Sequence, residues 1–199
     1  MTEARVPFTG DEQLLDLGAH VCAVHDAPER VLETLALAFR AGLERGERCA
    51  YIASPEAADT VRGRIEDSGL DAGAAVSGGD LVFLSDREEL LKGGDEFDPD
   101  HLIDAVKALF GKTLEAGYAG LRLSADVPWL TRNVPGGERA MEFEEKADEI
   151  VNSPGVPLMA ICQYRLSELE PEDTLEILER HPLTLIGGQV HLNEEYAQA

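Results

Sequence analysis

The connection between the first apolar segment and the helix that follows it carries residues that could do chemistry. An apolar strand at residues 19–24 leads through 25–28 (His-Asp-Ala-Pro) into an amphipathic pattern at 29–45. A phosphate-binding P-loop has this layout, and in it glycines let amide N–H groups surround phosphate oxygens while a lysine neutralises charge. The connection here has neither the glycines nor the lysine. We therefore expect no phosphate binding at this loop.

Histidine and cysteine side chains near the apolar segments could bind a metal ion. His20, Cys22 and His25 lie close together in the sequence, whereas Cys162 and His181 come much later. Structural zinc sites use closely paired ligands, and neither His-x-Cys nor His-x-x-x-x-His has that spacing. We therefore assign no metal ligand. His20 is interpreted as a histidine at a strand start, and His181 as a helix-end residue that suits the local dipole.

Carboxylates could act as a general acid and base. Asp126 and Glu144 would form such a pair only if the fold brings them together, and with 39 acidic residues some pair near a cleft is expected by chance. The motifs Gly-x-Ser-x-Gly, His-Glu-x-x-His and Cys-x-x-Cys do not occur in the chain. We expect a protein that is not an enzyme and that carries no cofactor.

Three further side chains could contribute to a binding site. Arg122 stands among apolar residues, where an unpaired guanidinium would be costly, so it should pair with Asp126, Glu144 or a ligand. We favour an internal salt bridge. Trp129, the only tryptophan, would be either the wall of an apolar pocket or a core aromatic at the sheet edge. Tyr164 could place its hydroxyl in the same cavity, although a plain strand-end tyrosine is the simpler interpretation.

Hydrophobic periodicity predicts alternating strands and helices that would position these side chains. Strands are expected at residues 19–24, 48–53, 81–84, 120–124 and 158–164, helices at 29–45, 56–68, 99–116, 138–151 and 172–180, a loop at 71–79, and a hairpin at 184–192. After a lead-in at 1–13, residues 14–199 are thus predicted to form one domain. Its fold class is three-layer α/β, with a mostly parallel central sheet, right-handed crossovers and an antiparallel C-terminal hairpin.

Ligands of open parallel sheets bind beyond the carboxyl ends of the strands. The side chains that follow each strand are therefore expected to line one rim. They are His25, Asp26, Ser54, Glu56, Asp126, Trp129, Gln163, Tyr164 and Arg165.

Composition argues against several classes of partner. The formal charge of −22, from 17 basic and 39 acidic residues, disfavours nucleic acids and anionic membranes, because lysine and arginine supply most of their binding. The chain shows neither an apolar run that could span a bilayer nor a signal-peptide pattern, so we expect a soluble, cytoplasmic protein. The acidity is consistent with a high-salt cytoplasm. Three widely spaced cysteines predict buried thiols rather than disulfides.

Several stretches of sequence, taken together and in order, resemble the MEDS family, the methanogen/methylotroph DcmR-type sensory domains. They are residues 20–26 (HVCAVHD), 41–49 (AGLERGERC), 117–129 (GYAGLRLSADVPW), 160–164 (AICQY), His181-Pro182 and Gly187-Gly188, and the likeness covers about residues 14–196. The resemblance implies a KaiC/RecA-like core that has lost its P-loop. It also implies a sensory module for small molecules, such as halomethanes, methylated compounds or other hydrocarbon derivatives.

The family's recurrent polar and aromatic positions imply a set of ligand-binding residues in this chain, which the rim residues His25 and Asp26 join. The set is His20, Arg122, Asp126, Trp129, Glu144, Cys162, Gln163, Tyr164 and His181. Two positions differ from common family patterns: His25 stands where an aromatic residue is common, and Arg165 where an aspartate is common. The identity of the ligand is therefore left open.

The expected function is signal transduction through a separate partner. Family members commonly join the domain to a DNA-binding helix-turn-helix or a kinase, and this chain has neither. The resemblance thus implies a regulatory protein partner, either a histidine kinase or a transcription factor, with a homo-oligomer also open. Two alternatives remain at this point: a degenerate RecA/KaiC-like nucleotide-binding protein, and a pure protein-interaction regulator.

Overall fold

A computed structural model describes residues 15–85, 91–92, 96–126 and 134–196 of the chain. The predicted lead-in at 1–13 lies outside these residues, and so does Trp129, which is expected either in a pocket wall or in the core.

The central sheet has seven strands in the order β3-β2-β6-β7-β1-β8-β9. The strands are β1 (His20–His25), β2 (Arg48–Ala53), β3 (Leu81–Ser85), β6 (Leu121–Asp126), β7 (Leu158–Arg165), β8 (Leu183–Ile186) and β9 (Gln189–Leu192). All neighbours pair in parallel except β8 and β9, which form an antiparallel hairpin. A separate antiparallel pair joins β4 (Leu91–Lys92) to β5 (Glu96–Phe97). The predicted fold class is confirmed.

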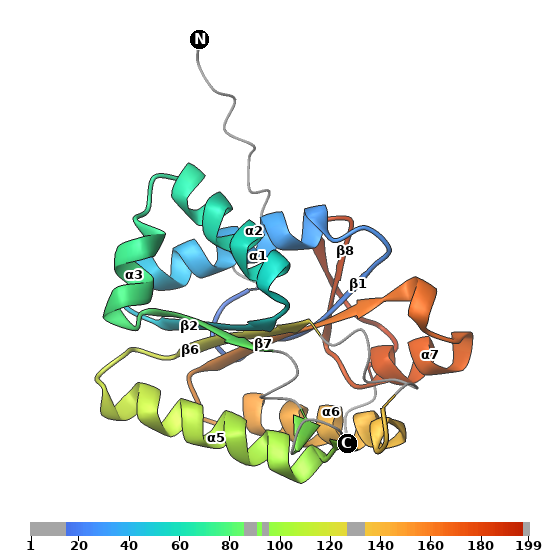
Figure 1. Ribbon diagram of the computed structural model, residues 1–199. Coiled ribbons are helices and arrows are strands. Elements are labelled where there is room, and N and C mark those ends of the chain that lie inside the picture. Colours follow the sequence, from blue (N-terminus) through green and yellow to red (C-terminus); the bar gives the residue numbers. More distant parts are fainter. Residues whose placement is uncertain (1–14, 86–90, 93–95, 127–133, 197–199) are drawn as a thin grey trace.

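Helices cover both faces of this sheet, which gives the three layers seen in Figure 1. On one face lie α1 (Glu29–Glu44), α2 (Pro55–Asp67) and α3 (Ala72–Gly78), and on the other lie α5 (Pro99–Glu115) and α6 (Ala140–Val151). The short helix α7 (Pro171–Glu179) precedes β8, and single 3-10 turns occur as η2 (Gly137–Arg139) and η3 (Leu166–Glu168). None of the helices in the described ranges has the length and apolar character needed to cross a membrane.

The segment expected to be a loop at 71–79 forms helix α3, so that prediction was wrong. Asp71 caps the helix by accepting a hydrogen bond from the backbone N–H of Ala74 at 2.8 Å. Gly79 ends it in the left-handed conformation, with φ of 81°. The alanines and this pair of end signals outweigh the glycine and serine content, on which the prediction of a loop was based.

Strand alternation divides the apolar residues between two cores. Cys22 and Val24 of β1 belong to the core beneath α5 and α6, whereas Val21 and Ala23 belong to the core beneath α1 and α2. The same alternation in β7 directs Cys162 toward α6. Side chains from β1 and β7 are thus brought together under one helix. All three cysteines are buried free thiols, as predicted.

Candidate functional site

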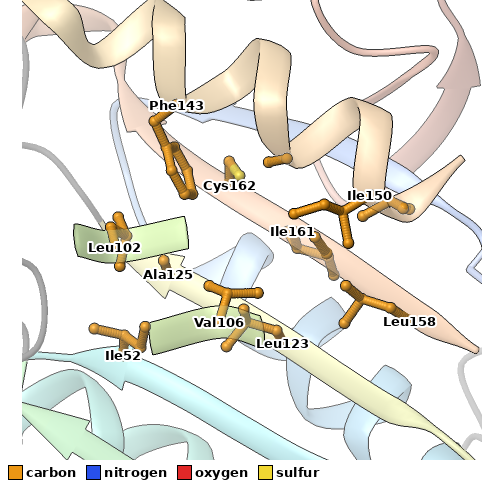
Figure 2. Close-up of a pocket in the computed structure, with 13 residues that line it drawn as sticks. Ile52, Leu102, Val106, Leu123, Ala125, Phe143, Ile150, Leu158, Ile161 and Cys162 are labelled. Atoms are coloured by element: carbon orange, nitrogen blue, oxygen red, sulfur yellow. The ribbon is translucent and has the colours of Figure 1, made fainter. Parts of the chain in front are cut away.

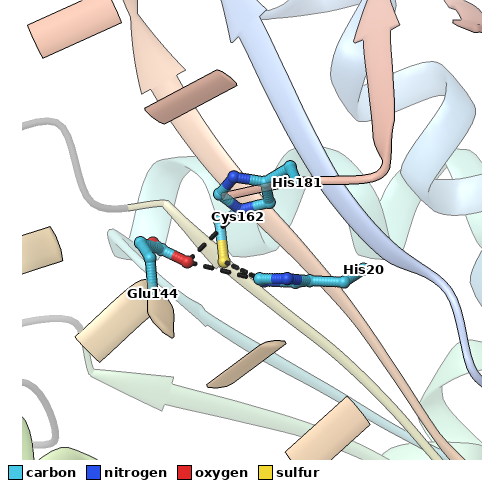
Figure 3. A group of neighbouring side chains, drawn as sticks. All are labelled: His20, Glu144, Cys162 and His181. Atoms are coloured by element: carbon cyan, nitrogen blue, oxygen red, sulfur yellow. Dashed lines mark hydrogen bonds and ion pairs between the residues drawn. The ribbon is translucent and has the colours of Figure 1, made fainter. Parts of the chain in front are cut away.

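Four buried side chains with metal-ligating chemistry meet between α6 and the sheet, and Figure 3 shows them facing one another. We call His20, Glu144, Cys162 and His181 the buried quartet. His20 begins β1, Cys162 lies within β7, Glu144 comes from α6, and His181 precedes β8. One ligand atom from each of the four lies within 4.8 Å of the others.

Both imidazole rings turn their Nε2 atoms toward the same carboxylate oxygen. Glu144 Oε2 lies 3.4 Å from His20 Nε2 and 3.2 Å from His181 Nε2. The Sγ atom of Cys162 lies 3.8 Å from His20 Nε2. The two rings are stacked at a tilt, with centroids 4.1 Å apart.

Hydrogen bonds from outside the buried quartet hold this arrangement. His20 Nδ1 lies 3.0 Å from Asp148 Oδ1, and His181 Nδ1 lies 2.7 Å from the carbonyl oxygen of Ile177. These partners can only accept, so each Nδ1 carries a hydrogen and each Nε2 is the inward atom. Tyr164 donates its hydroxyl to Glu144 Oε1, which leaves Oε2 facing the histidines.

The charges in this cluster shift its pKa values in different directions. Burial alone would raise the pKa of Glu144, but the neighbouring His181 and His20 outweigh it and hold that pKa well below its ordinary value. Burial lowers the pKa of His20, yet hydrogen bonds to Asp148 and Glu144 raise it overall. For His181, burial and the neighbouring His20 lower the pKa. These neighbours thus favour the protonated ring at His20 and the neutral ring at His181.

An apolar cavity adjoins the buried quartet, between α5, α6 and the sheet (Figure 2). The cavity has a volume of ≈ 30 Å³, about two to three times the space that one water needs. Its walls are aliphatic and aromatic apart from one thiol, and they include Leu102, Val106, Phe143, Ile150 and Cys162. Cys162 therefore belongs to both the cavity wall and the buried quartet.

The rim expected at the strand ends is formed in part. Asp126 pairs in register with Gln163, and His25 with Arg165, so the ends of β6, β7 and β1 lie side by side. Arg165 Nη2 lies 3.9 Å from Asp126 Oδ2. Burial and the nearby Arg165 lower the pKa of His25.

Other residues expected at the rim have different contacts. Gln163 faces the α1 side, where its amide nitrogen donates to Ser124 Oγ at 2.9 Å and to the Tyr51 hydroxyl at 3.2 Å. Asp26 accepts from the backbone N–H of Ser167 at 3.0 Å. Ser54 caps α2, and Glu56 is exposed in the first turn of that helix.

Tyr164 and Arg122 also lie away from this rim. Tyr164 turns to the opposite face of the sheet, toward Glu144. Arg122 forms an internal salt bridge, as we favoured, but its partner is Glu47 rather than Asp126 or Glu144. It also donates to the carbonyl oxygen of Leu15 at 2.7 Å.

The position of Arg122 in its strand explains the different partner. Arg122 is the second residue of β6, so it lies near the amino end of the strand, whereas Asp126 is the last. Strand alternation places both residues on the face of the sheet opposite Glu144, whose neighbours His20 and Cys162 face α6. Arg122 is therefore remote from the buried quartet and from the strand-end rim.

Sequence comparison decides the family. The MEDS model, described as the MEthanogen/methylotroph, DcmR Sensory domain, matches residues 19–182. The chain belongs to the MEDS family. The match begins one residue before His20 and ends one residue after His181, so all of the buried quartet lies within the MEDS domain. No curated protein is significantly similar to the chain.

Solved structures similar to this MEDS domain share its fold at low sequence identity. The KaiC-like protein PH0186 from Pyrococcus horikoshii OT3 is 16% identical, with a TM-score of 0.60 over 88% of this chain and 76% of that one. The flagellar accessory protein FlaH from Methanocaldococcus jannaschii is 9% identical, with a TM-score of 0.55 over 90% of this chain and 79% of that one. The predicted KaiC/RecA-like architecture is confirmed.

Two partners of the predicted site residues were not identified from the sequence. Glu47 and Asp148 were not recognised as partners of Arg122 and His20. Asp148 carried a usable signal, because it follows Glu144 by four positions on a helix and so shares its face. Glu47 carried none, since it lies in the turn between α1 and β2 and meets Arg122 only through the pairing of β2 with β6.

Proposed function

We propose that this MEDS domain is a sensory module that binds a small, largely apolar molecule in the cavity between α5, α6 and the sheet. Membership of a sensory domain family supports a signalling role. The single observation that carries the choice of ligand is the cavity wall, which is apolar except for the thiol of Cys162. Its size suits a molecule of few heavy atoms, such as a halomethane or a methylated compound.

The chemistry of the wall selects against polar ligands. A polar molecule entering the cavity would lose its hydrogen bonds to water and gain almost none, which costs several kcal/mol. An apolar molecule gains dispersion contacts with walls that otherwise face empty space, and apolar cavities of this kind stay dry until such a molecule binds. The expected specificity is thus for size and apolar character.

Helix α6 is the element through which occupancy would be relayed. It contributes Phe143, Ala147 and Ile150 to the cavity and Glu144 to the buried quartet. A ligand can shift a conformational equilibrium only by binding one state more tightly than the other. We propose that occupancy biases the position of α6 and that a separate regulatory protein, a kinase or a transcription factor, reads it.

Thermal unfolding in the presence of dissolved dichloromethane tests this proposal. We expect a concentration-dependent rise in the midpoint for the unaltered chain, because a ligand that binds only the folded state stabilises it. Val106→Phe places a ring in the cavity and should abolish the rise. The matched control is Val76→Phe, at an exposed position on α3, which should retain it. An equal response in both variants, or none in the unaltered chain, would refute the cavity as the binding site.

Nucleotide binding is the second candidate, favoured by the similarity to a KaiC-like protein. The local chemistry opposes it. A phosphate at the start of α1 would meet Asp26 and Glu29, and Pro28 precedes the helix without offering a side-chain hydrogen bond. Isothermal titration with Mg-ATP decides the question: micromolar binding would support this candidate, and the absence of heat would dismiss it.

A further inference from the structure

We propose that the buried quartet is a binding site for a divalent transition-metal ion, with zinc as the best match. This inference goes beyond the sensory function and rests on separate observations. Its four ligand atoms are two imidazole nitrogens, one thiol sulfur and one carboxylate oxygen, and all come from side chains in the core. Nitrogen, sulfur and oxygen donors of these types are those that zinc takes in proteins.

Three separations between ligand atoms are close to those around a tetrahedral ion, and all of the ligand atoms lie within 4.8 Å of one another. Zinc bonds of about 2.0–2.3 Å in tetrahedral geometry place neighbouring ligand atoms about 3.3–3.6 Å apart. Glu144 Oε2 lies 3.4 Å from His20 Nε2 and 3.2 Å from His181 Nε2. The Sγ atom of Cys162 lies 3.8 Å from His20 Nε2. Small side-chain movements would therefore complete the site.

Two of these atoms lack a hydrogen-bond partner among the residues that the structure describes. They are Glu144 Oε2 and His181 Nε2, both in fully buried positions. Nδ1 of His181 lies 2.7 Å from the carbonyl oxygen of Ile177, so Nε2 is the ring nitrogen that faces Glu144 Oε2, at 3.2 Å. A buried imidazole nitrogen and a carboxylate oxygen at this separation need a proton or a cation between them, and a metal ion would bind both atoms at once.

Charge and outer contacts also suit an ion. The carboxylate of Glu144 and a thiolate at Cys162 would balance a 2+ charge, so the filled site would be neutral, as burial demands. Each histidine donates a hydrogen bond from Nδ1, the nitrogen that would not bind the ion. The acceptor is Asp148 for His20 and the carbonyl oxygen of Ile177 for His181. Metal-bound histidines are oriented in this way in known sites.

Four protein ligands with none left to solvent make a structural site rather than a catalytic one. The ion would join α6 to β1, β7 and the start of β8, which are far apart in the sequence. Cys162 must lose its proton on binding, so uptake should release protons to the solvent. It should also raise the free energy of unfolding, because the unfolded chain has no preformed site.

Cobalt is the probe for the experiment, because a thiolate–cobalt bond gives a charge-transfer band and a tetrahedral ion gives strong visible bands. The full chain is freed of metal with a chelator and titrated with Co²⁺. We expect both signals to saturate at about one ion per chain, as for a single mononuclear site. Added Zn²⁺ should then abolish them, because zinc binds such sites more tightly than cobalt. Failure to take up cobalt would overturn the proposal.

Matched variants assign the ligands. Cys162→Ser should remove the charge-transfer band and weaken cobalt binding at least ~100-fold. Loss of a residue that only orients a ligand can already cost about 100-fold in metal affinity, and Cys162 would be a ligand itself. Cys22→Ser is its control, because Cys22 lies beside Cys162 in the sheet register but outside the buried quartet. His181→Gln should abolish the visible bands, whereas His101→Gln, at an exposed position, should not.

X-ray absorption of the zinc-loaded unaltered chain gives a test that needs no variant to fold. A first shell of two imidazoles, one sulfur and one oxygen is expected. A shell of oxygens alone, or a charge-transfer band that survives in Cys162→Ser, would overturn the assignment.

Discussion

His181 Nε2 lies 3.2 Å from Glu144 Oε2, and the two side chains have exposed fractions of 0% and 1%. One carboxylate of α6 thus faces two histidines, from the first strand of the domain and from the segment that leads into β8. This contact places a buried charged group of α6 at the point where three segments of the chain meet.

Glu144→Gln should destabilise the metal-free protein and reduce the acid dependence of its stability. The pKa of Glu144 is depressed in the folded state, so its contribution is present above the unfolded value of about 4.3 and is lost as pH falls below it. Removing the charge leaves the His20 imidazolium with one fewer partner, at a cost of about 3–5 kcal/mol. Urea unfolding between neutral and acid pH in the presence of a chelator measures both effects.

The control for this variant is Glu145→Gln, because Glu145 is exposed on the same helix. It should change the free energy of unfolding by less than about 0.5 kcal/mol. An unchanged acid dependence in Glu144→Gln would show that the pKa of this carboxyl is the same in the folded and unfolded states, and would contradict its ion pairs with the histidines.

Arg122→Met should lower stability without affecting ligand binding. Arg122 is 1% exposed and paired with Glu47, and losing one partner of a buried pair costs about 3–5 kcal/mol. The double variant Arg122→Met with Glu47→Leu should recover most of that loss. Urea unfolding tests the stability, and dichloromethane-dependent unfolding tests the binding. If the folded Arg122→Met variant no longer responded to dichloromethane, Arg122 would have to be assigned to the binding site.

Two helical glycines should respond in opposite ways to alanine. At Gly42 an added Cβ would lie 2.5 Å from Arg122 Cδ and 2.7 Å from its Nε, whereas at Gly111 it would meet nothing within 4 Å. Gly111→Ala should therefore raise stability by about 1 kcal/mol, through helix propensity alone. Gly42→Ala should lower it. Higher thermal midpoints in both variants would contradict this expectation, because they would mean that Arg122 can move away from the added methyl group at Gly42 without a loss of stability.

Tyr164→Phe should weaken cobalt binding while leaving its thiolate band in place. The tyrosine hydroxyl donates to Glu144 Oε1 and so orients the other oxygen toward the histidines. Outer partners of this kind are worth about 10–100-fold in metal affinity. Competition with a chelator of known affinity measures the change. Tyr118→Phe, which removes a hydroxyl bound to Asp80 away from the buried quartet, should have no effect.

Much of the fold could be predicted from the sequence, because each strand and helix is specified by local patterns. The strand at Arg48–Ala53 has the predicted bounds. Helices α1 and α5 were predicted from the spacing of the apolar residues along one face of each. The buried quartet could not be predicted in this way. His20, Glu144, Cys162 and His181 come from four separate elements, so no local spacing joins them, and only the parallel pairing of β1 with β7 brings two of them together.

The rim was predicted too broadly for a related reason. Chain order identifies the residue that follows a strand but does not tell which face of the sheet its side chain takes. Tyr164 and Gln163 are neighbours in β7, yet one contacts Glu144 and the other contacts Ser124. One position along a strand reverses the face.

A methyl NMR titration of the full chain with dichloromethane tests the central proposal most directly. Saturable shifts are predicted for the cavity-lining methyls of Val106, Leu123 and Ile150, while Leu185, in the core on the other face of the sheet, stays unchanged. Shifts that grow without saturation, or that are equally large at Leu185, would contradict a specific sensing cavity.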